Sequence, residues 1–329
     1  MSPQLPPIYA YASPRRPHYP RHIQPVAREL KERGHAVELL RPGRTPPEGS
    51  VALVASATDT QALSTTGNRR IIHIEHGAGQ TYDGDPATRG SRGYPGGEGY
   101  DRVILFLCPS QTVADKWTAR YPDAAAVAVG CPALDDYHRT PITPTQPRIA
   151  MTFHWRSGHG PEASTAWEVY SRAIADQLIP LALDQGWSLI GTEHPRWEGT
   201  LLTDWKMLGV PTAGRQGVSG WTDVMDRATL LVADNTSMQT EFASLGRPVL
   251  WLNSPEYRRD VDHGGRFWDW PKGQVSCDSP FDLADKVRDA MADGPAVAAA
   301  RQAMVNDVYI ACDGKAAERA ADAIEAVLA

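Results

Sequence analysis

The sequence predicts an α/β protein of two doubly wound, Rossmann-like domains, with a helical tail at the C-terminal end. In both halves, short apolar runs alternate with helical stretches, which is typical of parallel sheets covered on both faces. Residues 140–147 separate the halves; they hold three prolines and no apolar period, as a stiff linker does. The length of 329 residues also suits two domains better than one.

In the first half, we place the first domain at residues 1–142 and the linker at residues 143–148. A helix is expected over residues 22–33, because the stretch is amphipathic and Gly34 follows it as a stop. A second helix is expected over residues 111–120. The strands expected here are short apolar runs at residues 8–12, 37–40, 51–55, 71–74, 103–107 and 125–129.

The second half restarts the alternation, and we place the second domain at residues 149–310 and a C-terminal helix at residues 311–329. The expected strands are residues 149–153, 187–191, 230–233 and 249–252. The expected helices are residues 163–184 with an interruption at Pro180, then 221–227, 237–245, 281–292, 296–309 and 315–328. In such sheets ligands bind at the carboxyl ends of strands, and the cleft between two facing domains is the default site.

The composition excludes several classes of protein. A net charge of -6 argues against broad, sequence-independent binding of nucleic acid, which needs a basic face. The apolar runs are strand-sized, so we expect no membrane span, and residues 1–7 lack the basic and apolar regions of a signal peptide. The widely spaced cysteines predict reduced thiols in a cytoplasmic protein; they are Cys108, Cys131, Cys277 and Cys312.

The most informative segment joins the strand at 230–233 to the helix at 237–245. Asp234 ends the strand, and a helix N-terminus with the hydroxyls of Thr236 and Ser237 can bind phosphate oxygens. Glu241 lies one turn further along the helix, where its carboxylate can accept both hydroxyls of a ribose. This pattern predicts a nucleoside diphosphate site. The alternative is that Asn235, Thr236 and Ser237 only cap the helix.

In the first half, Glu75 and His76 end a strand and enter a glycine-rich loop that starts at Gly77. Glycine allows backbone to approach a ligand closely, and long loops at strand ends often carry function. His76 is the candidate general base on an acceptor hydroxyl. Glu75 or Asp83 are alternatives, as the base or as the group that orients the histidine, and a structural loop histidine is the remaining interpretation.

The first strand-to-helix loop, residues 13–20, carries Arg15, Arg16 and His18. In the predicted topology it faces the same cleft as His76, where it can contact the acceptor or a phosphate. The alternative is a proline-stiffened surface loop without a ligand.

These segments resemble, in order, motifs of GT-B glycosyltransferases, and most of all the CDP-glycerol glycerophosphotransferases of teichoic acid synthesis. Asp234 to Ser237 with the strand after Gly246 resembles that family's Asp-x-Ser-Ser and Gly-(Lys/Arg)-Pro-Val. Further similar motifs are His76-Gly77, the Gly-x-Pro stretch at 130–135, the Thr-Trp-Arg-like stretch at 152–156 and His194-Pro195. The resemblance implies a transferase that moves a glycosyl or polyol-phosphate group from a nucleotide sugar or CDP-polyol to an acceptor hydroxyl.

The resemblance also implies that His194 binds the pyrophosphate of the donor, and Arg156 can neutralise phosphate charge with its planar guanidinium. Alternatives are a strand-end histidine capped by its proline and a solvated surface arginine. Thr236 replaces the family's first serine, and its basic surface helices are absent, so we carry over donor binding without donor identity. The acceptor stays open among a polymer, a metabolite and a modified nucleic-acid base.

Two other functions compete with the transferase. A non-hydrolysing sugar-nucleotide 2-epimerase shares the fold, but its motif normally has Asp-Ser-Gly-Gly and paired glutamates, where this chain has a single Glu241. A sugar-nucleotide binding protein without catalysis is the third possibility. Two Asp-x-Asp patterns, at residues 83–85 and 260–262, match a metal signature of another glycosyltransferase fold. Because neither directly follows a strong buried strand, we expect no metal and no cofactor.

Overall fold

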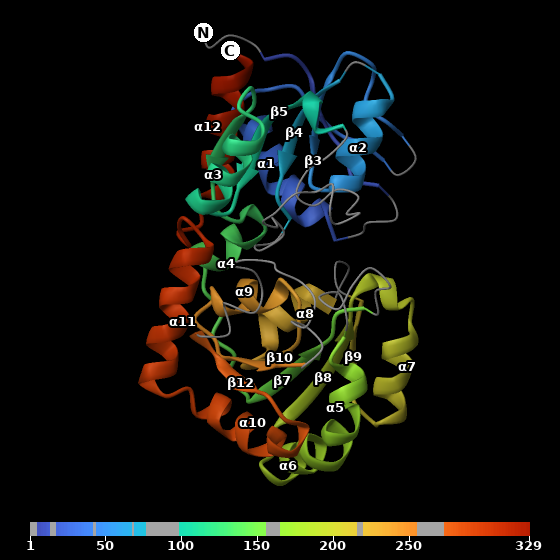
Figure 1. Ribbon diagram of the computed structural model, residues 1–329, viewed down its shortest axis with the longest axis vertical. Coiled ribbons are helices and arrows are strands. Elements are labelled where there is room, and N and C mark those ends of the chain that lie inside the picture. Colours follow the sequence, from blue (N-terminus) through green and yellow to red (C-terminus); the bar gives the residue numbers. More distant parts are fainter. Residues whose placement is uncertain are drawn as a thin grey trace. The chain divides into compact units, whose positions relative to one another are not determined.

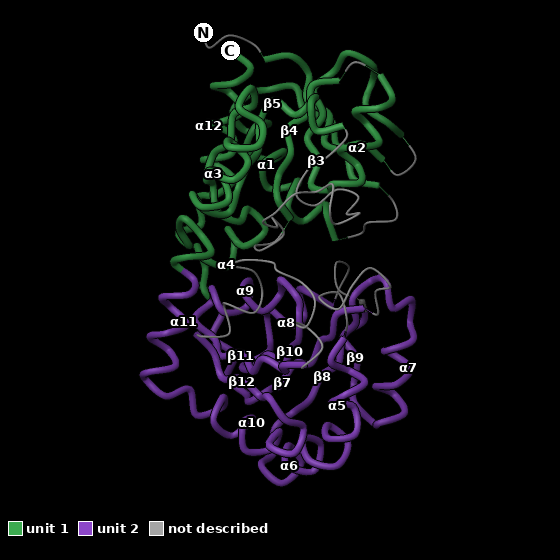
Figure 2. Tube along the Cα trace, viewed as in Figure 1, with its two compact units in different colours: residues 1–141, 306–329 green, residues 142–305 purple. Residues whose placement is uncertain are grey.

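Two parallel six-stranded sheets form the framework of the protein in the computed structural model (Figure 1). The structure describes residues 5–13, 18–41, 44–67, 69–76, 99–155, 165–215, 220–254 and 273–329. The chain divides into two compact units, the first made of residues 1–141 with 306–329 and the second of residues 142–305 (Figure 2). The end of the chain thus returns to the first unit, and the boundary falls within helix α11 (Pro295–Val308).

The sheet of the first unit has the strand order β2-β1-β3-β4-β5-β6. Its strands are β1 (Ile8–Ala10), β2 (Val37–Leu39), β3 (Val51–Val54), β4 (Arg70–Ile74), β5 (Val103–Cys108) and β6 (Ala125–Ala128). Helices are α1 (Pro20–Glu32), α2 (Ala57–Thr65), α3 (Gln111–Arg120), α4 (Asp135–Arg139) and α12 (Ala316–Leu328), with 3-10 turns at Tyr100–Arg102 and Pro132–Leu134. Strand order reverses at β1, because β2 and β3 pair with its two sides. In doubly wound sheets, ligands bind at the carboxyl ends of the strands at such a switch point.

Successive residues of β3 face opposite sides of this sheet, as the two-residue period of a strand requires. Val51 and Leu53 pack with α1 and α12, whereas Ala52 and Val54 pack with α2 and α3. Both layers are apolar, which explains why β3 is buried along its whole length.

The tail helix α12 packs against α1 in the first unit (Figure 1). Its first turn is held by Asp135, whose buried carboxylate accepts hydrogen bonds from the Ala316 and Ala317 amides at 2.9 and 2.7 Å. A carboxylate at a helix N-terminus satisfies amides that the helix cannot bond itself. The docking of α12 therefore depends on a side chain about 180 residues earlier in the chain.

The second sheet has the order β12-β11-β10-β7-β8-β9. Its strands are β7 (Arg148–Thr152), β8 (Ser188–Glu193), β9 (Thr212–Arg215), β10 (Leu230–Ala233), β11 (Val249–Leu252) and β12 (Val275–Cys277). Its helices are α5 (Trp167–Ala173), α6 (Ile179–Asp184), α7 (Thr200–Met207), α8 (Gly220–Arg227), α9 (Met238–Ala243), α10 (Leu283–Ala292) and α11, with 3-10 turns at Pro195–Trp197 and Pro280–Asp282.

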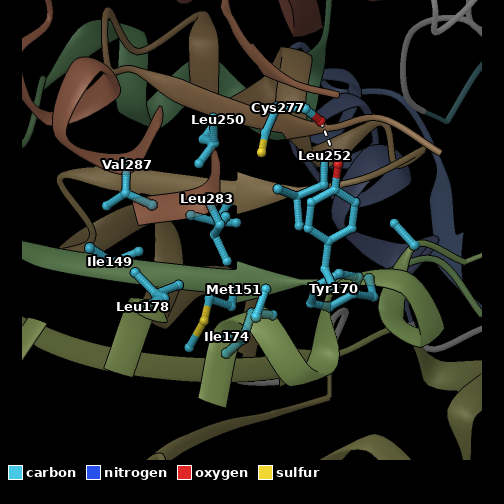
Figure 3. Close-up of a cluster of buried hydrophobic side chains, with 14 of the residues drawn as sticks. Ile149, Met151, Tyr170, Ile174, Leu178, Leu250, Leu252, Cys277, Leu283 and Val287 are labelled. Atoms are coloured by element: carbon cyan, nitrogen blue, oxygen red, sulfur yellow. Dashed lines mark hydrogen bonds between the residues drawn. The ribbon is translucent and has the colours of Figure 1, made fainter. Parts of the chain in front are cut away.

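The core of the second unit gathers aliphatic side chains from β7, β11, α10 and the stretch Ile174–Leu178 around Tyr170 of α5 (Figure 3). The Tyr170 hydroxyl donates to the carbonyl oxygens of Cys277 and Asn253, at 2.6 and 2.9 Å. Between α5 and α6 the helix widens into a π-helical stretch, Ile174–Leu178, just before Pro180. Proline cannot continue the α-helical bonding, and a wider turn accommodates the missing donor, so the expected interruption takes this form.

Among the described residues, no helix is both long and apolar enough to cross a membrane. All four cysteines are free thiols. Burial raises the pKa of the Cys108 thiol well above its usual value, so this residue behaves as a core side chain.

His73 of β4 is a buried titratable group in the first unit. Its ring lies among Tyr100, Phe106 and Trp117, and its Nδ1 shares a 2.8 Å hydrogen bond with the Thr60 hydroxyl. Burial lowers the pKa of His73 from its usual 6.5 to about 4, because a charged imidazole is poorly solvated in this cluster.

Stability of the first unit is therefore expected to fall as the pH drops from 6.5 toward 4. In this window the unfolded chain binds a proton that native His73 does not, which costs on the order of 3 kcal/mol in full. His73→Gln should show a shallower loss of unfolding free energy in urea titrations between pH 7 and 4.5. His138→Gln, on a partly exposed histidine, is the control and should follow the wild type; parallel curves for all three proteins would contradict this account.

Candidate functional site

Asp234 directly follows the buried strand β10, and its side chain bonds groups that follow the neighbouring strand β7. Its carboxylate is fully buried and accepts hydrogen bonds from the His154 amide at 2.7 Å, the Ala166 amide at 2.9 Å and the Thr165 hydroxyl at 3.3 Å. The donors stand on either side of residues 156–164, in the connection from β7 to α5. Asp234 thus fixes both ends of that connection, and Arg156 lies within it, outside the described residues.

Three polar residues follow Asp234 at the start of α9: Asn235 and Thr236 are buried, and Ser237 is partly exposed. Thr236 donates its amide to the Asp234 carbonyl at 2.8 Å, and its hydroxyl accepts from the Met238 amide at 3.4 Å. Ser237 occupies the N-cap position with helical backbone angles, and its side chain makes no capping hydrogen bond. Asn235 is 3% exposed. The side chain of Thr236, rather than that of Ser237, thus bonds the first turn of α9. The helix α9 is shorter at both ends than the predicted helix at 237–245.

Glu241 is also fully buried, and its Oε2 accepts a 2.6 Å hydrogen bond from the indole Nε1 of Trp221 on α8. A buried carboxylate needs such donors, because an unpaired charge away from water is costly. The structure therefore joins the predicted ribose-binding carboxylate to Trp221, a residue that the sequence analysis did not single out. The two lie 20 residues apart, so no local motif indicates the bond.

His194 follows β8 and has a defined tautomer. Its Nδ1 accepts a hydrogen bond from the Arg196 amide at 3.2 Å, and an accepting nitrogen carries no proton, so the neutral ring is protonated at Nε2. His154 has the opposite arrangement, because its Nδ1 lies 2.9 Å from the Trp155 carbonyl oxygen, which can only accept. The two rings are 5.8 Å apart.

Trp155 and Arg196 complete this aromatic cluster. The Trp155 ring lies 6.4 Å from the His194 ring, and the Arg196 guanidinium lies over the Trp155 ring at 4.6 Å. The indole of Trp197 donates to the carbonyl oxygens of Phe153 and His154, both at 3.2 Å, and so ties the end of β8 to the end of β7. The carboxyl ends of β7, β8 and β10, which are neighbours in the sheet, therefore carry His154, His194 and Asp234 together.

In the first unit, His76 follows β4 and lies against the start of α1. Its ring centroid is 4.4 Å from that of Tyr19, 6.0 Å from that of His18 and 6.3 Å from that of His22. The structure thus brings His18 next to His76. The other predicted residues of this region lie outside the described residues; they are Arg15, Arg16, Gly77 and Asp83.

Glu75 lies in different surroundings from His76. It is 8% exposed, and its Oε2 accepts from the indole Nε1 of Trp117 on α3 at 3.4 Å. Burial, with a smaller contribution from the Glu75 charge, raises the pKa of Tyr100 and Cys108, which belong to the cluster on the α2 and α3 side of the sheet. The structure therefore places Glu75 in an aromatic core, and His76 with the rings at the start of α1.

The part of the chain that the structure describes holds no group of three or more His, Cys, Asp or Glu residues arranged to bind a metal ion. Both Asp-x-Asp patterns, at residues 83–85 and 260–262, fall outside that part.

No family model matches the chain, and no curated protein matches it by sequence. Its fold is similar to a putative UDP-N-acetylglucosamine 2-epimerase from Listeria monocytogenes, with 13% identity, 98% of this chain and 96% of that chain covered, and a TM-score of 0.67. The wall teichoic acid polymerase TagF is 11% identical, with 98% and 88% covered and a TM-score of 0.64. The UDP-GlcNAc 2-epimerase from Neisseria meningitidis bound to UDP-GlcNAc is 13% identical, with 97% and 99% covered and a TM-score of 0.61. At these identities the likeness is one of fold, and it confirms the predicted two-domain α/β fold of the GT-B type.

We expect Asp234→Asn to lower the unfolding free energy by about 1–3 kcal/mol, because an amide oxygen replaces a carboxylate that three donors share. Hydrogen exchange should accelerate at the His154 and Ala166 amides. The control is Asp285→Asn, an exposed residue paired with Arg288, which should cost little. Equal stability of both variants would mean that Asp234 does not anchor the connection.

Proposed function

We propose that the protein is a transferase that binds a nucleotide-activated donor, a nucleotide sugar or a CDP-polyol, at the strand ends of the second unit. The observation that carries this proposal is the convergence of His154, His194 and the Asp234 segment at the carboxyl edge of one parallel sheet, where doubly wound folds bind ligands. The fold neighbours add support, since their names mention UDP, UDP-GlcNAc and CDPG as ligands.

In this proposal the second unit stabilises the leaving nucleotide. His194 directs its protonated Nε2 to the diphosphate, and a neutral imidazole donates such a bond without needing a charge. Thr236, Ser237 and Asn235 line the start of α9, and Arg156 adds charge. Preorganised donors of this kind stabilise a developing oxyanion in the transition state. We therefore propose that the reaction needs no metal ion and no cofactor.

His76 is the proposed general base in the first unit, where it takes the proton from the acceptor hydroxyl. Its position among the rings of His18, Tyr19 and His22 supports this role better than the core position of Glu75 does. Asp83 remains a candidate from the sequence. The acceptor itself stays open among a polymer, a metabolite and a modified nucleic-acid base.

A sugar-nucleotide 2-epimerase is the second candidate, because two of the fold neighbours carry that name. We favour the transferase because Asn235 to Met238 departs from the glycine-containing motif of epimerases and only Glu241 follows it. A thermal-shift panel of UDP-, GDP-, ADP-, CMP- and CDP-linked donors tests donor binding. Turnover of the best donor with and without an acceptor then separates the two activities, since an epimerase needs none.

Glu241→Gln should weaken binding of the best nucleotide by about 1–3 kcal/mol, as expected for a lost charge-assisted hydrogen bond to ribose. Trp221→Phe is the matched variant, because it removes the indole donor and keeps the carboxylate. Calorimetry should find a much smaller loss of affinity for Trp221→Phe once both variants are shown to fold. If Glu241→Gln loses stability and keeps its affinity, the carboxylate serves only to hold Trp221.

His76→Ala should lower turnover about 10²–10⁴-fold and leave donor affinity near that of the wild type. The measurement is kcat together with the donor Kd, and His138→Ala is the control. A loss that appears mainly in the donor Kd would assign His76 to donor binding and place the base elsewhere.

The initial rate in EDTA should equal the rate without chelator, with at most modest stimulation by Mg²⁺ or Mn²⁺. A rate that vanishes in EDTA and returns with Mn²⁺ would instead make Asp83 and Asp85 metal ligands.

A further inference from the structure

The Gly-Arg-Pro-Val stretch at residues 246–249 contains a buried arginine to which the proposed function assigns no role. Helix α9 ends shortly before it, and Gly246 has a left-handed backbone with a φ of 73°, which favours glycine. The Arg247 side chain after this turn is 9% exposed. A guanidinium does not lose its charge in proteins, so its burial requires acceptors. Those acceptors indicate what the arginine does.

Arg247 donates to the C-terminal end of α8. Its Nη1 bonds the Ala228 carbonyl oxygen at 2.8 Å, and its Nη2 bonds the Met225 carbonyl oxygen at 2.6 Å. In a continuing helix Met225 would accept from the Thr229 amide, but that amide donates to the Arg148 carbonyl of β7. Arg247 therefore takes the place of the helical donor, and its charge lies at the negative end of the helix dipole.

The other end of α8 carries Trp221, whose indole donates to Glu241 of α9 at 2.6 Å. Phe242 follows Glu241 on α9, and the Arg247 guanidinium lies over its ring, 4.9 Å from the ring centre. All four side chains are buried. The two helices are thus joined at both ends of α8, and we call this closed set of contacts the α8–α9 clamp; it consists of Trp221, Glu241, Phe242 and Arg247.

The clamp makes the position of the Glu241 carboxylate depend on Arg247. Helix α8 has eight residues and is about 12 Å long, so a shift of its C-terminal end also displaces Trp221 at its start. A hydrogen bond weakens steeply when its angle or length departs from the optimum. A buried carboxylate whose donor moves away must turn toward another donor, because an unsatisfied charge is costly.

We propose that Arg247 is a positioning residue of the donor site. By fixing α8, it keeps the Trp221 indole on Glu241 and the carboxylate in the orientation that binds the ribose of the donor. This role rests on the proposed function, in which Glu241 contacts that ribose. Arg247 acts through α8 and not by touching the nucleotide, as residues that orient a binding group do.

The first measurement follows the indole N–H of Trp221 by NMR, in the full chain labelled with ¹⁵N in its ten tryptophans. Trp221→Phe assigns the signal. A proton in a short bond to a carboxylate resonates downfield, so Arg247→Gln should move the Trp221 signal upfield. Arg247→Lys keeps the charge and three donors, so it should move the signal in the same direction but less.

Arg69→Gln is the matched control in the first unit. Arg69 is 8% exposed and also donates to backbone carbonyl oxygens, those of Pro46 at 2.9 Å and Leu63 at 3.5 Å. Its loss should lower the melting temperature and leave the Trp221 signal in place. Thermal melts establish that each variant folds, and Arg247→Lys carries the same test if Arg247→Gln does not fold.

The second measurement is a double-mutant cycle on the affinity for the best nucleotide of the donor panel. Arg247→Gln should weaken binding about threefold, which is within the range of couplings between residues in contact, and Arg69→Gln should not change it. In a chain that already carries Glu241→Gln, Arg247→Gln should have no further effect on the affinity, because the group through which it acts is gone. An arginine that only stabilises the fold would leave the affinity of the folded protein unchanged.

An unmoved Trp221 signal in folded Arg247→Gln, an equal displacement in Arg69→Gln, or additive losses of affinity in the cycle would overturn the positioning role. The NMR signal requires neither donor nor turnover. If no nucleotide binds the wild type, the proposed function fails, and the Trp221 signal still decides whether Arg247 fixes α8. If donors bind and react while the Trp221 signal ignores Arg247, only the positioning role fails.

Discussion

The buried carboxylate of Asp234 is the constraint on which the candidate donor site depends. A charge with no exposed surface must be satisfied by donors, and here the donors are two backbone amides and a hydroxyl from the connection after β7. Because β10 lies beside β7 in the sheet, one side chain holds the ends of both connections together. Glu193 acts similarly one strand further on, where its buried carboxylate accepts from the Gly199 and Leu202 amides at the start of α7. Rigid strand ends of this kind are what a preorganised site requires.

The fold could largely be predicted from sequence, because buried parallel strands are continuous apolar runs. The expected strands at 230–233 and 249–252 coincide with β10 and β11. The edge strands β9 and β12 were not predicted, since they are short and contain polar residues or glycine, and only pairing with a neighbour defines them. The tail was predicted as a helix, but its amphipathic pattern does not say which apolar surface it covers; Asp135 and α1 decide that.

Only those parts of the candidate site that consist of short, continuous sequence motifs could be predicted. Motifs at strand ends pointed to His76, His194 and the segment from Asp234 to Glu241. The hydrogen bonds that orient these side chains join residues far apart in the sequence. Asp234 and His154, for example, are 80 residues apart. The Trp221 partner of Glu241 and the ring cluster of Tyr19 and His22 around His76 were missed for the same reason. Local pattern locates such residues, and tertiary contacts decide their protonation and orientation.

The two histidines that follow β8 and β4 have different surroundings: a backbone amide bonds His194, whereas the rings of Tyr19, His18 and His22 lie around His76. The Arg196 amide donates to His194 Nδ1, so the neutral ring carries its proton on Nε2. His76 has His22 as its neighbour, and a charge on His76 lowers the pKa of His22 further. Burial is the main cause of the low pKa of His22, whose side chain is 1% exposed. In the proposed transfer, His194 donates a hydrogen bond to the donor diphosphate and His76 accepts the proton of the acceptor hydroxyl.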